Sequence, residues 1–172
     1  MNGGNLVEIA GILSNDNPQA VADAELLAKG FGAFYAEHAE WCGEMGCTVE
    51  VPNIIPIIFA YWMSGYGNER DEYGGYYDGR DAMDDVLDGL EPVIKNLGYP
   101  LDAGEIEYGG DETITEAMGI INENFNRKGY TLVSLDTDGG CAHLFIVRSA
   151  DYDRLVGLGE KINFKFSTEW KQ

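Results

Sequence analysis

Basic residues are scarce in this sequence, and their scarcity limits what the protein can bind. The chain has 11 Lys and Arg against 30 Asp and Glu, which gives a formal net charge of −19. The imbalance lies in residues 1–126, where only four basic residues accompany 24 acidic ones. Nucleic acids and anionic lipids are bound by basic side chains that replace counterions, so we expect neither as a partner. The charge favours a basic partner instead, or serves solubility alone.

Cysteines and long apolar runs are scarce as well. Three cysteines cannot all pair with one another, so the chain is not a disulfide scaffold, and a reducing cytoplasm is the simplest compartment. The longest apolar run, residues 54–63, contains Pro56 and is about half as long as a bilayer span. The N-terminus has no basic segment, and the apolar stretch of residues 6–13 is broken by Glu8 and Gly11, so it does not match a signal peptide. We therefore expect a cytoplasmic protein that does not bind membranes.

Motifs that hold phosphate or metal ions are missing too. The glycines of residues 65–79 are not followed by Lys and Ser or Thr, as a phosphate-binding loop requires. The carboxylates of residues 81–91 are spaced as on an exposed helix face and do not match an EF-hand. All Cys and His fall into two groups, His38, Cys42 and Cys47 in one and Cys141 and His143 in the other. Four of these could close a zinc site if folding assembled them, but there is no C-x-x-C pair, and we expect no metal and no cofactor.

The residues that are present suffice for one folded domain. Hydrophobic residues make up 45% of the chain, which is ordinary for a globular protein. Helical periodicity predicts helices over residues 5–13, 18–29, 53–64, 81–97 and 112–127. A further helix is expected to follow the interruption at Gly30 and Gly32 and to run to residue 44. Pro92 is expected to kink or break the helix of residues 81–97. Residues 65–79, with five glycines and four tyrosines, are predicted to form an irregular loop.

Residues 130–172 have the pattern of a ββαβ unit. Strands are expected over 130–136, 141–148 and 162–166, and a helix capped by Ser149 over 150–159. We therefore expect a single α+β domain spanning residues 1–172. In it, a mostly helical part (1–129) packs against a small, mainly antiparallel C-terminal sheet (130–172).

The expected hairpin places polar residues at its turn. A two-residue turn at Gly139-Gly140 would pair Asp136 with His143 and Asp138 with Cys141, all on one face. One interpretation is a nucleophilic set in which Cys141 attacks, His143 acts as base and Asp136 orients it. The other is a structural Asp–His pair, which we favour because the spacing matches no known nucleophile signature.

The segment from Gly65 to Glu91 is the best candidate for partner binding. Tyrosines bury area at low entropic cost, and carboxylates pair with Lys and Arg at the rim of an interface. The alternative is that the tyrosines fold back onto the helices. The candidate contact residues are Tyr66, Asp71, Glu72, Tyr73, Tyr76, Tyr77, Asp78, Asp81, Asp84, Asp85 and Asp88.

Two resemblances extend this interpretation. The runs Tyr130–Thr137 and His143–Val147 resemble a family of small, acidic bacterial proteins of uncharacterised function. The overall character is similar to immunity proteins of contact-dependent and polymorphic toxin systems, which are small, cytoplasmic and acidic and often neutralise cationic nucleases. That resemblance implies a basic toxin as the partner.

The sequence thus leads to three hypotheses about function. The first is a cytoplasmic immunity or inhibitor protein that binds a basic, nuclease-type bacterial toxin through the acidic, tyrosine-rich surface. The second is a small enzyme that uses Cys141, His143 and Asp136. The third is an acidic protein that mimics nucleic acid and occupies nucleic-acid-binding proteins by charge.

Overall fold

A four-stranded antiparallel sheet with helices on both faces forms the fold. The computed structural model describes residues 3–48, 54–67, 72–78, 80–110, 112–137 and 140–169. The helices are α1 (Gly3–Leu13), α2 (Pro18–Lys29), α3 (Phe31–Glu37), α4 (Ala39–Glu44), α5 (Ile54–Met63), α6 (Met83–Leu97), α7 (Ile114–Arg127) and α8 (Tyr152–Glu160). The strands are β1 (Gly74–Asp78), β2 (Tyr130–Asp136), β3 (Cys141–Arg148) and β4 (Lys165–Ser167), and single 3-10 turns span Ala103–Glu105 and Ser149–Asp151. The expected α+β class is confirmed.

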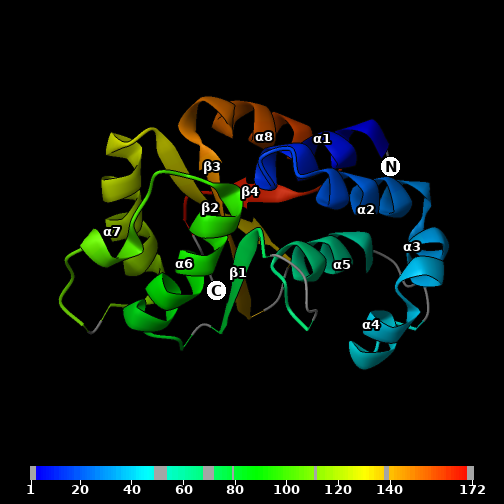
Figure 1. Ribbon diagram of the computed structural model, residues 1–172, viewed down its shortest axis with the longest axis horizontal. Coiled ribbons are helices and arrows are strands. Elements are labelled where there is room, and N and C mark those ends of the chain that lie inside the picture. The colour runs from blue at the N-terminus through cyan, green and yellow to red at the C-terminus, as the bar shows by residue number, and fades with distance from the viewer. Residues whose placement is uncertain are drawn as a thin grey trace.

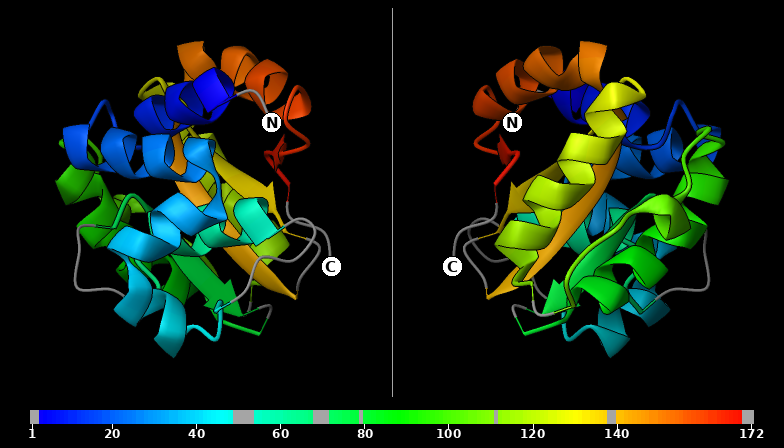
Figure 2. Two further views of the ribbon diagram at one scale, coloured as in Figure 1. Left: turned by 90° about the vertical axis from the view of Figure 1, so that its right-hand side faces the viewer. Right: turned by 90° about the vertical axis from the view of Figure 1, so that its left-hand side faces the viewer.

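The helices are divided between the two faces of the sheet (Figures 1 and 2). On one face, α6 packs against β1 and α7 packs against β2. On the other face, α1 contacts β3, and Ser64 directly after α5 contacts His143 of β3. Helix α8 lies beside α1 and leads back to β4 at the edge of the sheet. Because helices cover both faces, the inner strand β3 is buried from Ala142 to Val147.

Part of the segment predicted to be an irregular loop, residues 65–79, forms a strand instead, and residues 68–71 and 79 lie outside the described residues. Residues 74–78 form β1, which pairs antiparallel with β3 so that Tyr76 lies opposite His143. Gly74 and Gly75 are buried, and a Cβ atom at Gly74 would lie 2.4 Å from the ring of Phe145. Gly74 therefore provides clearance for the close approach of β1 to β3, and Gly75 provides clearance for the side chain of Tyr77.

The hairpin of β2 and β3 has a register one residue away from the expected one. Leu135 lies opposite His143, and Ser134 lies opposite Leu144. A shift of one residue moves a side chain to the other face of the sheet, so Asp136 and His143 are on opposite faces. Asp136 instead lies 3.5 Å from Lys165 of β4. The predicted pairing of Asp136 with His143 is therefore wrong, and Asp138 lies outside the described residues.

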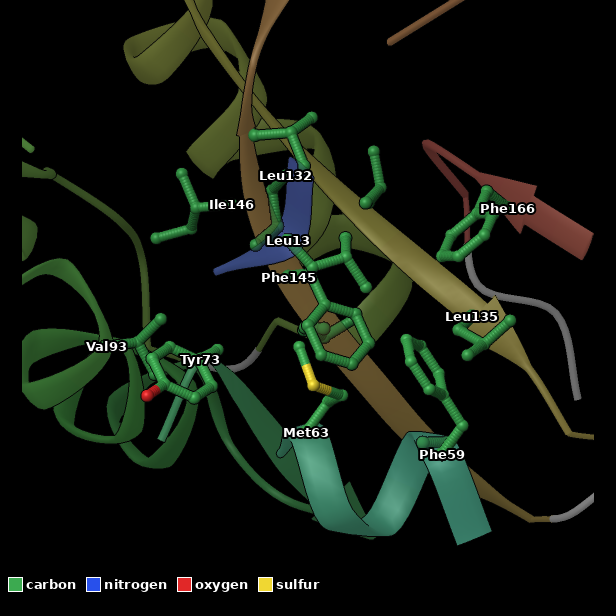
Figure 3. Close-up of a cluster of buried hydrophobic side chains, with 14 of the residues drawn as sticks. Leu13, Phe59, Met63, Tyr73, Val93, Leu132, Leu135, Phe145, Ile146 and Phe166 are labelled. Atoms are coloured by element: carbon green, nitrogen blue, oxygen red, sulfur yellow. The ribbon is translucent and has the colours of Figure 1, made fainter. Parts of the chain in front are cut away.

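One part of the hydrophobic core lies where α5 meets the sheet (Figure 3). Phe59 and Met63 extend from α5 toward Phe145 of β3 and Leu135 of β2, and all four side chains are at most 1% exposed. Phe166 of β4 closes the same cluster. Ile162, Phe164 and Phe166 are buried as expected, although the strand itself begins only at Lys165.

Three predictions about helices require correction. The helix expected to run to Glu44 is divided at His38, whose φ of −122° and ψ of 37° end α3 and begin α4. Pro92 lies within α6 and does not divide it. Ser149 does not cap α8, because its hydroxyl bonds the Thr131 hydroxyl at 2.8 Å.

The clearance at Gly74 can be tested by adding one methyl group. In Gly74→Ala, the Cβ would lie 2.4 Å from Phe145 and 2.7 Å from the Leu144 carbonyl oxygen, neither of which can move freely. We expect the free energy of unfolding in denaturant to fall by about 1–3 kcal/mol. The control is Gly119→Ala, where nothing lies within 4 Å of the new Cβ in helix α7 and a gain of up to about 1 kcal/mol is expected. Equal stability of the two variants would contradict the clearance argument.

Candidate functional site

An acidic groove runs between α6 and the segment Ala103–Tyr108. Its volume is about 360 Å³. Helix α6 contributes Asp84, Asp88 and Glu91 to one wall, while Ala103, Ile106 and Tyr108 form part of the other. We call this the acidic groove. It combines carboxylates with apolar side chains, which is the composition that accommodates the charged end and the aliphatic stem of Arg or Lys.

A second hollow continues the acidic groove toward the C-terminal end of α6. It has a volume of about 570 Å³, shares Glu91 and Ala103 with the acidic groove, and reaches Lys95, Tyr99 and Asp102. Lys95 is the single basic residue between positions 81 and 112 in the sequence. The two hollows together give α6 an elongated, predominantly acidic flank.

Helix α6 presents its carboxylates outward because its apolar residues face the sheet. Met83, Val86, Leu90 and Val93 are at most 1% exposed, whereas Asp84, Asp85, Asp88 and Glu91 are exposed. This pattern is the amphipathic period of a surface helix. The prediction that the carboxylates of residues 81–91 lie on an exposed helix face is confirmed for these four residues, whereas Asp81 is half-buried and precedes the helix.

Three predicted contact residues stabilise the start of α6. The Asp85 carboxylate accepts from the backbone N–H of Ala82 at 3.0 Å, and the Asp81 carboxylate accepts from that of Asp78 at 2.7 Å. The Asp78 carboxylate accepts from the Arg80 guanidinium at 3.1 Å, which lowers the pKa of Asp78. These carboxylates position the chain where β1 leads into α6, and Asp84 and Asp88 are the predicted residues that line the acidic groove.

Tyr108 is a surface residue that the sequence reasoning missed. Its side chain is 40% exposed and its hydroxyl donates to Asp84, which raises the pKa of Tyr108. An aromatic face beside carboxylates suits a cationic side chain, through cation–π attraction together with ion pairing. The signal that was overlooked is a tyrosine flanked by acidic residues in the run from Glu105 to Glu112.

Two of the four predicted contact tyrosines do not lie on the surface. Tyr73 and Tyr77 are 8% and 3% exposed, and the Tyr77 hydroxyl donates to the Val86 carbonyl at 3.1 Å. The expectation that these two rings are presented to a partner is therefore wrong, because Tyr77 of β1 and Tyr73 directly before β1 are buried in the core. Asp71 lies outside the described residues, and Glu72 is half-buried, which raises its pKa.

The other two tyrosines belong to a cluster on the opposite face of β1. Tyr66 is 41% exposed, and its ring centroid lies 4.3 Å from that of the half-buried Tyr76. Both rings also contact Tyr61. The Tyr76 hydroxyl lies 2.8 Å from the Cys141 sulfur, and this hydrogen bond raises the pKa of Tyr76. The tyrosines thus fold back onto the helices in part, as the alternative interpretation expected.

His143 is completely buried beside this tyrosine cluster. Its Nδ1 lies 3.4 Å from the Ser64 hydroxyl, and its ring packs edge to face on Tyr61 at 4.7 Å. Burial lowers the pKa of His143 to about 4, so the ring is neutral at pH 7. A neutral imidazole separated from Asp136 by the sheet fits a structural role better than that of an oriented base.

The remaining Cys and His do not assemble into a metal site. Among the residues that the structure describes, no three His, Cys, Asp or Glu side chains are grouped to hold a metal ion. Cys42 is buried, which raises its pKa to about 11, and Cys47 is half-buried. His38 lies 3.3 Å from the carboxylate of Asp23, a buried residue that also accepts from the Trp62 indole at 3.0 Å. These contacts hold α2, α5 and the α3–α4 junction together.

Comparison with known proteins identifies the family. A family model described as a domain of unknown function, DUF6630, matches residues 5–170, and the chain belongs to that family. No curated protein and no solved structure matches the chain. The match confirms the expectation of an uncharacterised family. Within the described residues, every helix is too short or too polar to cross a bilayer.

The neutral state of His143 predicts a pH dependence of stability. The unfolded chain binds this proton near pH 6.5, whereas the folded chain binds it only near pH 4. Unfolding is therefore favoured as the pH falls through this window, and the residue's contribution to the free energy of unfolding decreases by up to about 3 kcal/mol.

An NMR titration of the two histidines measures this directly. The ring resonance that disappears in His143→Gln should titrate with an apparent pKa near 4 in the wild-type protein. The variant should also lose less stability than the wild type between pH 6.5 and pH 4. A resonance that titrates near 6.5 would show that the ring is not buried as described.

Proposed function

We propose that this protein is a cytoplasmic immunity or inhibitor protein that binds and neutralises a basic bacterial toxin of the nuclease type. The active site of a nuclease is basic because it holds phosphate, so the protein that occupies it must be acidic. The observation that carries the proposal is the acidic groove, where Asp84, Asp88 and Glu91 lie beside the exposed ring of Tyr108. Carboxylates steer a basic partner to the surface, and an exposed aromatic ring gives it an anchor.

The enzyme hypothesis loses its geometric basis. Asp136 is on the opposite face of the sheet from Cys141 and His143 and pairs with Lys165. The thiol of Cys141 is instead hydrogen-bonded with the hydroxyl of Tyr76. A base-activated nucleophile requires the nucleophile, the base and the orienting carboxylate to be hydrogen-bonded in sequence, and the described positions of Cys141, His143 and Asp136 do not provide this arrangement.

The nucleic-acid mimic remains the competing proposal, and affinity capture distinguishes the two. The tagged protein is used to capture partners from lysate of its native cell at low and at high salt, and the captured proteins are identified by mass spectrometry. One stoichiometric basic protein that survives moderate salt supports the immunity proposal. A mixture of nucleic-acid-binding proteins that is lost as salt rises supports mimicry. Capture of neither kind contradicts both proposals.

The contribution of the acidic groove to association can be measured with the captured partner. We expect the triple variant Asp84→Asn, Asp88→Asn, Glu91→Gln to lower the association rate at low salt by about tenfold and to flatten its salt dependence. The control variant converts the exposed Glu37, Glu123 and Glu160 to Gln, which changes the net charge equally at residues that do not line the acidic groove. Stopped-flow or surface plasmon resonance gives the rates. Equal effects of the two triple variants would show that the groove is not the contact surface.

Variants of the two exposed tyrosines test which surface contacts the partner. Tyr108 and Tyr66 are exposed to the same degree, 40% and 41%, so they form a matched pair. We expect Tyr108→Ala to weaken binding about tenfold or more, mainly through faster dissociation, and Tyr66→Ala to change it about threefold or less. The reverse order would assign the interface to the tyrosine cluster around Tyr66.

A further inference from the structure

A separate cavity lies where the N-terminal helices meet the C-terminal unit. It has a volume of about 310 Å³ and lies between α1, the turn from α1 to α2, the end of β3 and the start of α8. Tyr99 separates it from the hollow beside α6, since this residue borders both. The volume is at the lower end of the range for small-molecule sites. The proposed interaction with a basic protein does not involve this cavity.

Charges of both signs line this cavity. Two of the chain's 11 basic residues, Arg148 and Arg154, border it together with the carboxylates of Glu8, Asp16 and Asp151. Arg154 donates through Nε to Glu8 at 2.7 Å, and Arg148 donates through one Nη to the Asn15 side chain at 2.6 Å. Each contact uses one of five N–H donors of a guanidinium, so both groups are positioned and retain further donors.

The turn on one side of the cavity has an unusual backbone. Asn15 and Asp16 are adjacent residues with left-handed conformations, at φ values of 52° and 60°. The Asn15 side chain also donates to the Leu97 carbonyl at 3.0 Å, which ties the turn to α6. Asn and Asp adopt this conformation more readily than other non-glycine residues, which suits them to this turn. Asp16 borders the cavity and lies close to Gly11. A Cβ atom at Gly11 would lie only 2.9 Å from the Asp16 carboxylate.

The rest of the lining is apolar apart from one phenol. Val7, Ile12 and Val21 are half-buried and border the cavity from α1 and α2. Tyr99 is 8% exposed, and burial raises its pKa to about 12. A tyrosine hydroxyl is protonated at neutral pH, so that of Tyr99 can donate to an anionic group.

We propose that this cavity binds a free α-amino acid with an apolar side chain. Arg148 and Arg154 bind the carboxylate, Asp16 and Asp151 bind the ammonium group, and Val7, Ile12 and Val21 contact the side chain. Charge selects this class of ligand. An anion alone would enter against the field of a protein with a net charge of −19, and a cation alone would pair with the three carboxylates of the lining but would leave its two arginines unused. A zwitterion brings no net charge and satisfies both signs.

Calorimetric titration with L-leucine and its blocked analogues tests the ligand class. We expect L-leucine to bind, and N-acetyl-L-leucine and L-leucinamide, which each lack one charge, to bind at least about tenfold more weakly. L-Valine and L-phenylalanine are titrated as well to measure the side-chain preference. Absence of binding by all three amino acids at millimolar concentration would overturn the proposal, as would equal binding of the blocked analogues.

Substitutions then locate the site. Arg154→Gln and Asp151→Asn should each weaken L-leucine binding about tenfold, whereas Arg127→Gln on α7, outside the lining, should not. Arg148→Lys keeps the charge but loses bidentate geometry and should also weaken binding. Because Arg148 holds Asn15, its variant is compared only after its melting curve matches the wild type. Equal affinity of Arg154→Gln and Arg127→Gln would overturn the assignment whether or not the Arg148 variant folds.

Discussion

The pairing of β1 with β3 is the interaction on which the rest of the structure depends. It joins a strand from the helical part of the chain to the C-terminal hairpin, with Tyr76 opposite His143 and Asp78 opposite Cys141. The close approach is possible because Gly74 places no side chain against Phe145. Helix α6 begins only a few residues after β1 ends, and the Asp81 and Asp85 carboxylates hold the connection. The strand pairing therefore also fixes the direction in which the acidic face of α6 points.

The alternation of side chains along β1 gives its two faces different surroundings. Tyr77 points into the core beneath α6, where its hydroxyl reaches the Val86 carbonyl. Tyr76 points to the other face, where it meets Tyr61, Cys141 and His143. Burial on that face keeps His143 neutral, since a charged imidazole would lose its hydration without gaining a carboxylate. The same alternation in the hairpin places Asp136 away from this cluster and next to Lys165.

The uneven charge of the sequence has a structural explanation. Basic residues of the C-terminal part pair with carboxylates across the fold: Arg154 with Glu8, Lys128 with Glu105 and Lys165 with Asp136. Exposed pairs of this kind contribute about 0–1 kcal/mol each, so their main effect is on the charge of the surface. Two of these pairs lie at α8 and at the sheet edge, and the third joins the end of α7 to the segment that borders the acidic groove. The flank of α6 keeps its excess of carboxylates, with Lys95 as the basic residue in its lining, and this separation distinguishes the acidic groove from the mixed-charge cavity.

The sequence by itself determined the α+β class, the positions of most helices and the outward acidic face of α6, because these depend on local periodicity and on helix ends. It also located the strands of the hairpin, since Leu132–Leu135 and Leu144–Val147 are apolar enough to be buried. The tertiary structure alone decided the hairpin register, the conversion of Gly74–Asp78 into a strand and the burial of Tyr73 and Tyr77. The acidic groove and the cavity at Arg148 also bring together residues distant in sequence, Asp84 with Tyr108 and Glu8 with Arg154. The physical reason is that strand pairing and packing depend on the partner segment, and a period of two residues does not show which partner or register is chosen.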